Sequence, residues 1–150
     1  MSRFSTAIPT LPAVLRKAAV RRVVRKAAVK GGAQVSFLNP AAFEYLFPVA
    51  NHWVVSPAQQ VSELAALVSA ATDGPAPAGI AVEQRHRELV AGLKGVERKA
   101  IWLGQLATRH PAYASLRALA QSLASATGAS LGVLAEGANA AGAHLAGVLP

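Results

Sequence analysis

The stretch Ala100-Ile101-Trp102-Leu103 begins the part of the sequence that decides the fold. It is a short apolar run closed by a glycine, and a Leu/Ala-rich segment of helical length follows over residues 112–127. Gly128 ends that segment, and a second apolar run occupies residues 130–134. A strand, a helix and a second strand in this order predict a crossover unit with parallel strands.

The same alternation extends toward the N-terminus. Further short apolar runs lie at residues 33–38 and 52–55, and helical spacing is found over 10–29, 57–73 and 82–93. Asn39 followed by Pro40 predicts one more short helix, which Pro48 would end. We therefore predict an α/β fold with a three-layer, mainly parallel sheet of about four strands and helices on both faces.

Basic residues concentrate at the N-terminus of the chain. The net charge is +8, and residues 1–30 contain eight Lys and Arg but no Asp or Glu, so the other 120 residues are neutral overall. The run Leu15-Arg16-Lys17-Ala18-Ala19 recurs nine residues later, on the opposite side of a continuous helix. We predict a basic segment over 1–23, either extraneous or a duplicated helix, and a single α/β domain over 24–150. A Gly/Pro-rich linker is expected at about 74–79.

Any partner that binds the basic segment is expected to be anionic. Its Lys and Arg side chains suit nucleic-acid phosphates, anionic lipid or an acidic partner subunit. The segment between Arg16 and Lys30 has no aromatic residue, and a solvated helix face is the commonest outcome for such a run. Nucleic-acid binding is therefore the weaker alternative.

The residue types and their spacing argue against several kinds of functional site. The chain has no Cys, which excludes disulfides, Cys-ligated zinc and Cys-ligated iron–sulfur clusters within it. There is no Gly-x-Ser-x-Gly motif and no phosphate-binding glycine fingerprint. The histidines lie 34, 24 and 34 residues apart without a metal-binding motif, and we interpret them as unrelated surface or loop imidazoles: His52, His86, His110 and His144.

The carboxylates give one candidate for catalysis. Glu83, Glu88 and Glu97 lie near basic residues and indicate a solvated face, whereas Glu136 lies in a Gly/Asn-rich tail over residues 136–144. Glycines recur there every five residues from Gly132, which we interpret as turns and close backbone packing. We predict no catalytic, cofactor-binding or metal-binding residue in this chain.

Three segments in a fixed order resemble a known family. They are a basic helix leading to Gly31-Gly32 and residues 33–40 (AQVSFLNP), then residues 101–111 (IWLGQLATRHP), then residues 127–143 from Thr127-Gly128 to Gly142-Ala143. Together they resemble the C-terminal, molybdopterin-oxidoreductase-like region of the G-type subunit of bacterial NADH-quinone oxidoreductase, respiratory complex I. The resemblance covers roughly residues 24–150.

The resemblance implies a scaffold role. The G-type subunit belongs to the cytoplasmic peripheral arm, at the cytoplasmic face of the inner membrane, and relays electrons from NADH through iron–sulfur clusters to quinone. Those clusters need Cys and so lie elsewhere in the full subunit, and this region is generally a scaffold without the pterin cofactor. The implied partners are other segments and subunits of the peripheral arm, with no nucleic acid and no direct membrane insertion.

The sequence departs from the family in two respects. The basic helix motif is present twice, and the chain stops at Pro150, where the family usually continues, so we expect a fragment of a longer subunit. The runner-up interpretation is a stand-alone nucleotide- or pterin-binding α/β domain. Enzymatic activity is implied only at the level of the whole complex.

Overall fold

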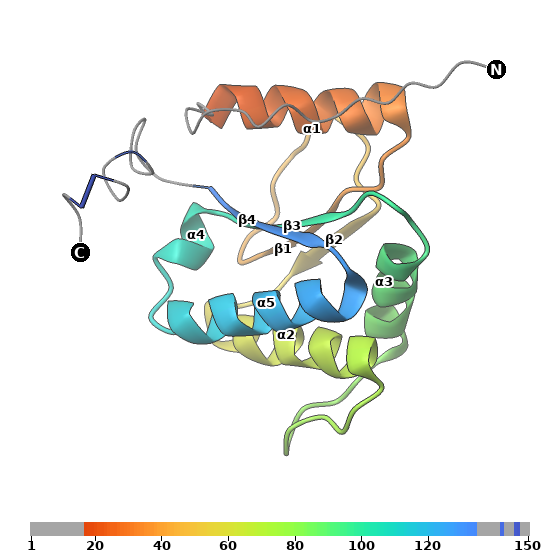
Figure 1. Cartoon of the computed structure of the whole chain (residues 1–150), viewed down its shortest axis with the longest axis vertical. Coiled ribbons are helices and arrows are strands. Elements are labelled where there is room, and N and C mark those ends of the chain that lie inside the picture. The colour runs from red at the N-terminus through yellow and green to blue at the C-terminus, as the bar shows by residue number, and fades with distance from the viewer. Residues whose placement is uncertain (1–16, 135–141, 143–145, 148–150) are drawn as a thin grey trace.

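The computed structural model describes residues 17–134, 142 and 146–147 of the chain. This part contains helices and strands in alternation (Figure 1). In chain order they are α1 (Lys17–Gly31), β1 (Ser36–Asn39), β2 (Asn51–Val54), α2 (Pro57–Thr72), α3 (Gln84–Lys94), β3 (Ala100–Leu103), α4 (Gln105–Thr108), α5 (Tyr113–Thr127) and β4 (Ser130–Val133).

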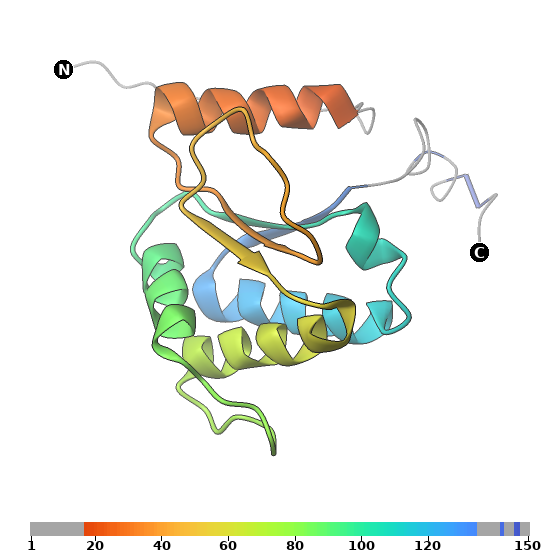
Figure 2. The same ribbon diagram turned by 180° about the vertical axis from the view of Figure 1, so that it is seen from behind.

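The strands pair in parallel and lie between helices. Phe37 of β1 is opposite His52 of β2, and Ile101 of β3 is opposite Leu131 of β4. Figures 1 and 2 show the strands in one layer, with α1 on one side and α2, α3 and α5 on the other. The prediction of a mixed α/β architecture with parallel strands is confirmed.

The predicted single sheet is not what the described residues form. Their strands make two separate two-stranded sheets, one of β1 and β2 and the other of β3 and β4. The strand number therefore agrees with the prediction, but the two pairs are not joined by a ladder of hydrogen bonds. The connectivity of these residues also gives no molybdopterin-oxidoreductase-like sheet.

The short helix predicted after Asn39 is also wrong. Residues 40–50 connect β1 to β2 without a helix. The Asn39 amide does not cap a helix but donates from Nδ2 to the Tyr45 hydroxyl at 2.7 Å. The Tyr45 ring stacks on Phe37 with centroids 4.1 Å apart, and the Phe47 ring is tilted against both, with centroids 6.3 Å from Phe37 and 5.7 Å from Tyr45. These contacts hold the segment against β1 in an irregular conformation.

The ends of the long helices follow the local signals in the sequence. Pro57 occupies the first turn of α2, where its missing N–H costs nothing. Asp73 ends α2 in the left-handed conformation with φ 52°, and Gly128 ends α5 with φ 73°. After α1, Gly32 has φ 65° and the Ala33 N–H donates to the Ala27 carbonyl at 3.0 Å.

The core lies between the strand layer and the helices α2, α3 and α5. Its buried centre consists of Leu67 and Ala71 from α2, Val90 from α3 and Leu123 from α5. Trp53 of β2 and Ile101 of β3 pack against this centre from the strands. The many alanines of α2 and α5 allow these two helices to approach closely, which explains how an Ala-rich sequence builds a core.

Helix α1 covers the opposite side of the strand layer less completely. It runs without a break through residues 23 and 24, where we placed a segment boundary. Ala28 is buried and Val24 is half-buried, whereas Val23 is 60% exposed and Val29 is also exposed. The apolar stripe of α1 is therefore only partly used by the contacts of this chain.

Candidate functional site

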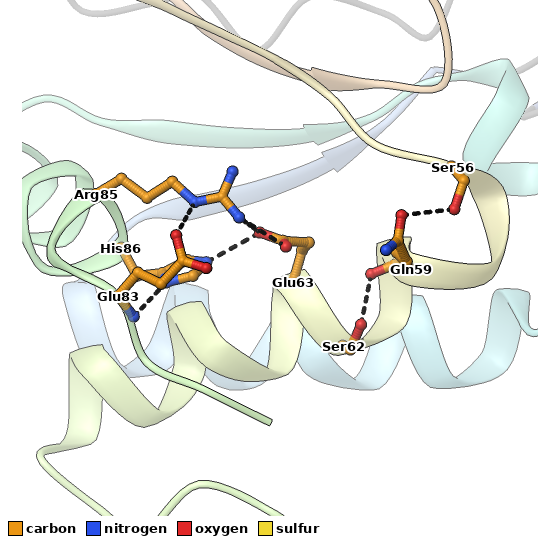
Figure 3. A network of polar contacts seen from close by, with 7 residues as sticks. All are labelled: Ser56, Gln59, Ser62, Glu63, Glu83, Arg85 and His86. Carbon is orange, nitrogen blue, oxygen red and sulfur yellow. Dashed lines mark hydrogen bonds and ion pairs between the residues drawn. The ribbon is translucent and has the colours of Figure 1, made fainter. Parts of the chain in front are cut away.

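A half-buried polar cluster joins α2 to the first turn of α3 (Figure 3), and His86 is its fully buried member. The Glu63 carboxylate of α2 accepts two hydrogen bonds from Arg85 Nη2, at 2.8 and 3.1 Å. Its Oε2 also lies 2.9 Å from His86 Nε2. Arg85 Nε is 2.8 Å from Glu83 Oε2, so the guanidinium lies between two carboxylates.

The hydrogen bonds of His86 define its tautomer. The backbone N–H of Glu83, the N-cap residue of α3, donates to His86 Nδ1 at 2.9 Å. Because Nδ1 accepts, Nε2 carries the ring proton and donates it to Glu63. His86 thus occupies the place that Glu or Gln takes in a capping box, and it joins that cap to the neighbouring helix.

Trp53 of β2 completes the cluster from the strand layer. The Arg85 guanidinium lies over the indole ring, 5.0 Å from its centroid, in a cation–π arrangement. The His86 ring meets the same indole edge-on, with centroids 5.5 Å apart. One strand and two helices are therefore held together by Trp53, Glu63, Arg85 and His86.

The geometry of this cluster fits a structural role. A Glu–His pair at 2.9 Å is a common acid–base arrangement, but both nitrogens of His86 are engaged and the residue is only 1% exposed. A general base must reach the proton that it abstracts, and this imidazole faces Trp53 and Glu63 instead. The cluster fixes α3 to α2 and β2.

The structure places the remaining histidines apart from one another. His52 is half-buried in β2 with its ring edge-on to Tyr45. His110 lies in the turn before α5, where Nε2 is 2.9 Å from the Pro57 carbonyl and Nδ1 accepts from the Ala112 N–H. No group of three metal-ligating side chains occurs among the residues that the structure describes. His144 is outside those residues.

One interpretation of the histidines was wrong, and one group of residues was missed. His86 is the largest fully buried side chain of the described residues and is not a surface imidazole. The cluster of Glu63, Arg85 and His86 was not predicted, because its members come from positions 22 and 23 residues apart. The only local signal was Glu83 three residues before His86 at a helix start.

The other carboxylates agree with a solvated face where they are described. Glu83, Glu88 and Glu97 are exposed residues, and Glu88 accepts a hydrogen bond from Gln84 at 3.1 Å. Glu136 lies outside the described residues, as does the Gly/Asn-rich tail except for Gly142. For Gly132 the interpretation as close packing is confirmed, since a Cβ there would lie 2.7 Å from the Trp102 ring.

A second feature is an apolar surface on the strands. Val54 of β2 is 56% exposed and Trp102 of β3 is 50% exposed. Ile101 points to the core, so its neighbour Trp102 lies on the opposite side of the strand layer, the side of α1. Side chains of this size are normally covered in strands that lie between two layers of helices.

No described helix is long and apolar enough to cross a membrane. Comparison with known proteins found no matching family model, no matching curated protein and no matching solved structure. The class that the structure defines is therefore a small α/β unit with paired parallel strands.

Proposed function

We propose that this chain is a scaffold segment of the G-type subunit of NADH-quinone oxidoreductase, and that it binds other polypeptides of the peripheral arm. The observation that carries the proposal is the exposed apolar surface on the strands, which includes Val54 and Trp102. Burying such a surface against a partner would stabilise the assembly by about 25 cal/mol for each Å² of apolar area removed from water.

The positions of the resembling segments support the same proposal. The residues of the first segment form the end of α1 and β1, those of the second form β3 and α4, and the third begins at the end of α5 and continues into β4. The proposal includes the finer expectations: a molybdopterin-oxidoreductase-like sheet in the full subunit, iron–sulfur clusters outside this chain, and a cytoplasmic place at the inner membrane.

The cluster around His86 supports a scaffold function through rigidity. It fixes α3 against α2 and β2 through charged hydrogen bonds and through the indole of Trp53. A segment that presents a surface to partners gains affinity when that surface is held in one conformation before binding. In the proposed role, Glu63 and His86 are positioning residues for the strand layer.

Co-purification tests the proposal directly. The tagged chain is expressed together with the peripheral-arm subunits of a bacterial complex I, and the expected result is a stable complex on size exclusion. A Trp102→Ser variant should bind at least about tenfold more weakly, a loss of about 1.4 kcal/mol. An Arg87→Ser variant, which alters an exposed residue of α3, is the matched control.

Three other results would contradict the scaffold proposal. One is a chain that stays monomeric beside all of those subunits. Another is purification with a bound pterin or nucleotide, detected by absorbance and mass spectrometry, which would support the stand-alone binding domain. The third is tight, salt-dependent binding to DNA through α1, whose Arg22, Arg25, Lys26 and Lys30 are basic residues free of any acidic neighbour on the same helix.

A further inference from the structure

The two strand pairs face each other with unpaired edges. Figures 1 and 2 together show the order β4, β3, β1, β2 across the layer, so β1 and β3 are the inner strands. Within the described residues, β1 is hydrogen-bonded to β2 only and β3 to β4 only. All four strands run from the side of α3 toward the side of α4 (Figure 1).

The hydrogen bonds to β2 show which backbone N–H and C=O groups of β1 lie at its inner edge. The carbonyls of Val35 and Asn39 accept from the N–H groups of Ala50 and Val55, at 2.8 and 2.9 Å, and so face β2. The N–H and C=O of one residue point to the same edge of a strand, and those of the next residue point to the other edge. Those of Ser36 and Leu38 therefore face away from β2, toward β3.

The inner edge of β3 follows from the same argument. The carbonyls of Lys99 and Leu103 accept from Ser130 and Leu134, at 3.1 and 2.9 Å, and so face β4. The N–H and C=O groups of Ala100 and Trp102 therefore face β1. Two rows of backbone donors and acceptors are directed at each other across the middle of the layer.

The inner strands β1 and β3 are less buried than expected for strands in the middle of a covered sheet. None of the four residues of β1 is fully buried, and Ser36 is exposed. In β3, Ala100 and Trp102 are exposed and only Leu103 is buried. Inner strands with helices on both sides are normally the most buried part of an α/β domain.

We propose that one extended strand from a partner polypeptide binds between β1 and β3 and joins the two pairs into one five-stranded sheet. The strand would hydrogen-bond to Ser36 and Leu38 on one side and to Ala100 and Trp102 on the other, as in β-strand addition. Both of its faces would be covered, so its chemistry is a run of Val, Ile or Leu without Pro, matching the four-residue length of β1 and β3.

The proposal deepens the scaffold function and rests on it for the identity of the partner. It also accounts for the separation of the strands into two pairs, because a missing central strand leaves an unpaired edge on each neighbour. The cations of α1 on one side of the layer favour a strand flanked by Asp or Glu.

Hydrogen exchange with a designed peptide tests the proposal on the intact chain. The probe is a synthetic peptide with a central run of Val and Ile residues flanked by glutamates, and the control peptide has Pro at the central position. The expected result is that exchange of the Leu38 and Trp102 amides slows about tenfold with the probe and not with the control. The Val54 and Leu131 amides, which face the outer edges, should not change.

Proline variants of the chain provide the matched comparison. Ala100→Pro removes a donor at the inner edge, and Val54→Pro removes one at an outer edge; both sites keep their existing pairing. Each variant is first checked for the far-ultraviolet circular dichroism of the native chain. Ala100→Pro should abolish the protection of Leu38, and Val54→Pro should leave it unchanged.

The proposal is overturned if the probe protects neither inner amide, if it protects Val54 and Leu131 instead, or if the Pro-containing peptide protects equally well. Failure of the scaffold function has a different signature. Peptide binding without co-purification would contradict only the scaffold function. If the Ala100→Pro variant co-purifies with the subunits as well as the unmodified chain does, only the added strand is contradicted.

Discussion

The indole of Trp102 lies directly on Gly132 of the adjacent strand. An ideal Cβ at position 132 would be 2.7 Å from two carbons of the Trp102 ring, a distance that real side chains do not adopt. The two residues are opposite each other in the parallel register of β3 and β4. The glycine at this position is therefore required by packing between strands.

Replacing this glycine should destabilise the protein. Gly132→Ala forces the indole to move and should lower the free energy of unfolding by about 1–3 kcal/mol, measured by urea denaturation. The control is Gly92→Ala in α3, where a Cβ meets only Gln34 Oε1 at 4.0 Å and helix propensity should raise the stability by up to about 1 kcal/mol. In the Trp102→Ala background, the cost of Gly132→Ala should disappear; an unchanged cost would disprove the contact.

His86 should be sensitive to truncation because both of its ring nitrogens are used. His86→Ala leaves the Glu83 N–H without its acceptor and removes a donor to Glu63, so we expect a loss of about 2–3 kcal/mol in the free energy of unfolding. His86→Gln should recover part of this loss, because an amide oxygen can accept from the N-cap N–H. Equal losses for the two variants would show that ring packing alone matters.

Glu63 should contribute more than an exposed carboxylate. Glu63→Ala removes the partner of both Arg85 and His86 and should cost about 1–3 kcal/mol. The matched control is Glu88→Ala, whose side chain accepts from Gln84 on an exposed surface and should change stability by less than about 0.5 kcal/mol. Thermal denaturation followed by circular dichroism distinguishes the two, and similar shifts would contradict the role of the cluster.

The two left-handed helix ends should respond in opposite directions. Gly128→Ala places a Cβ at φ 73° and should cost about 1–2 kcal/mol, whereas Asp73→Gly relieves a residue at φ 52° and should raise stability by a few tenths to about 1 kcal/mol. Chemical denaturation measures both. A stabilising Gly128→Ala would mean that α5 ends in a different conformation in solution.

Tyr45 should ionise at higher pH than a free tyrosine. Burial raises the pKa of its hydroxyl, and the hydrogen bond from Asn39 opposes this rise. The native state then holds a proton that the unfolded chain has lost, so stability is fully present below the unfolded pKa of about 10 and falls as the pH rises through the native pKa. In the Tyr113→Phe background, phenolate absorbance follows Tyr45 alone.

The role of Asn39 provides a second measurement on the same group. Removing the amide in Asn39→Ala takes away the donor that favours the phenolate, so the pKa of Tyr45 should rise further. A lower pKa in this variant would show that the loop between β1 and β2 opens when the hydrogen bond is lost.

Local sequence signals determined the types and approximate ends of most elements. The spacing of apolar residues predicted α2, α3 and α5, and short apolar runs between turn residues predicted the four strands. Gly32 and Gly128 marked helix ends because a left-handed residue is needed there. The prediction failed after Asn39, where ring stacking with Phe37 outweighs a cap that looked favourable locally.

Only the tertiary structure decided which distant residues meet. Glu63 and His86 are 23 residues apart, and their contact depends on how α2 and α3 pack, for which the local pattern contains no information. The pairing of strands into two sheets also depends on the three-dimensional order of the layer. Short-range preferences of the chain therefore determine the helices and strands. Long-range packing determines the cluster around His86, the contact of Trp102 with Gly132 and, among the described residues, which edges of β1 and β3 stay unpaired.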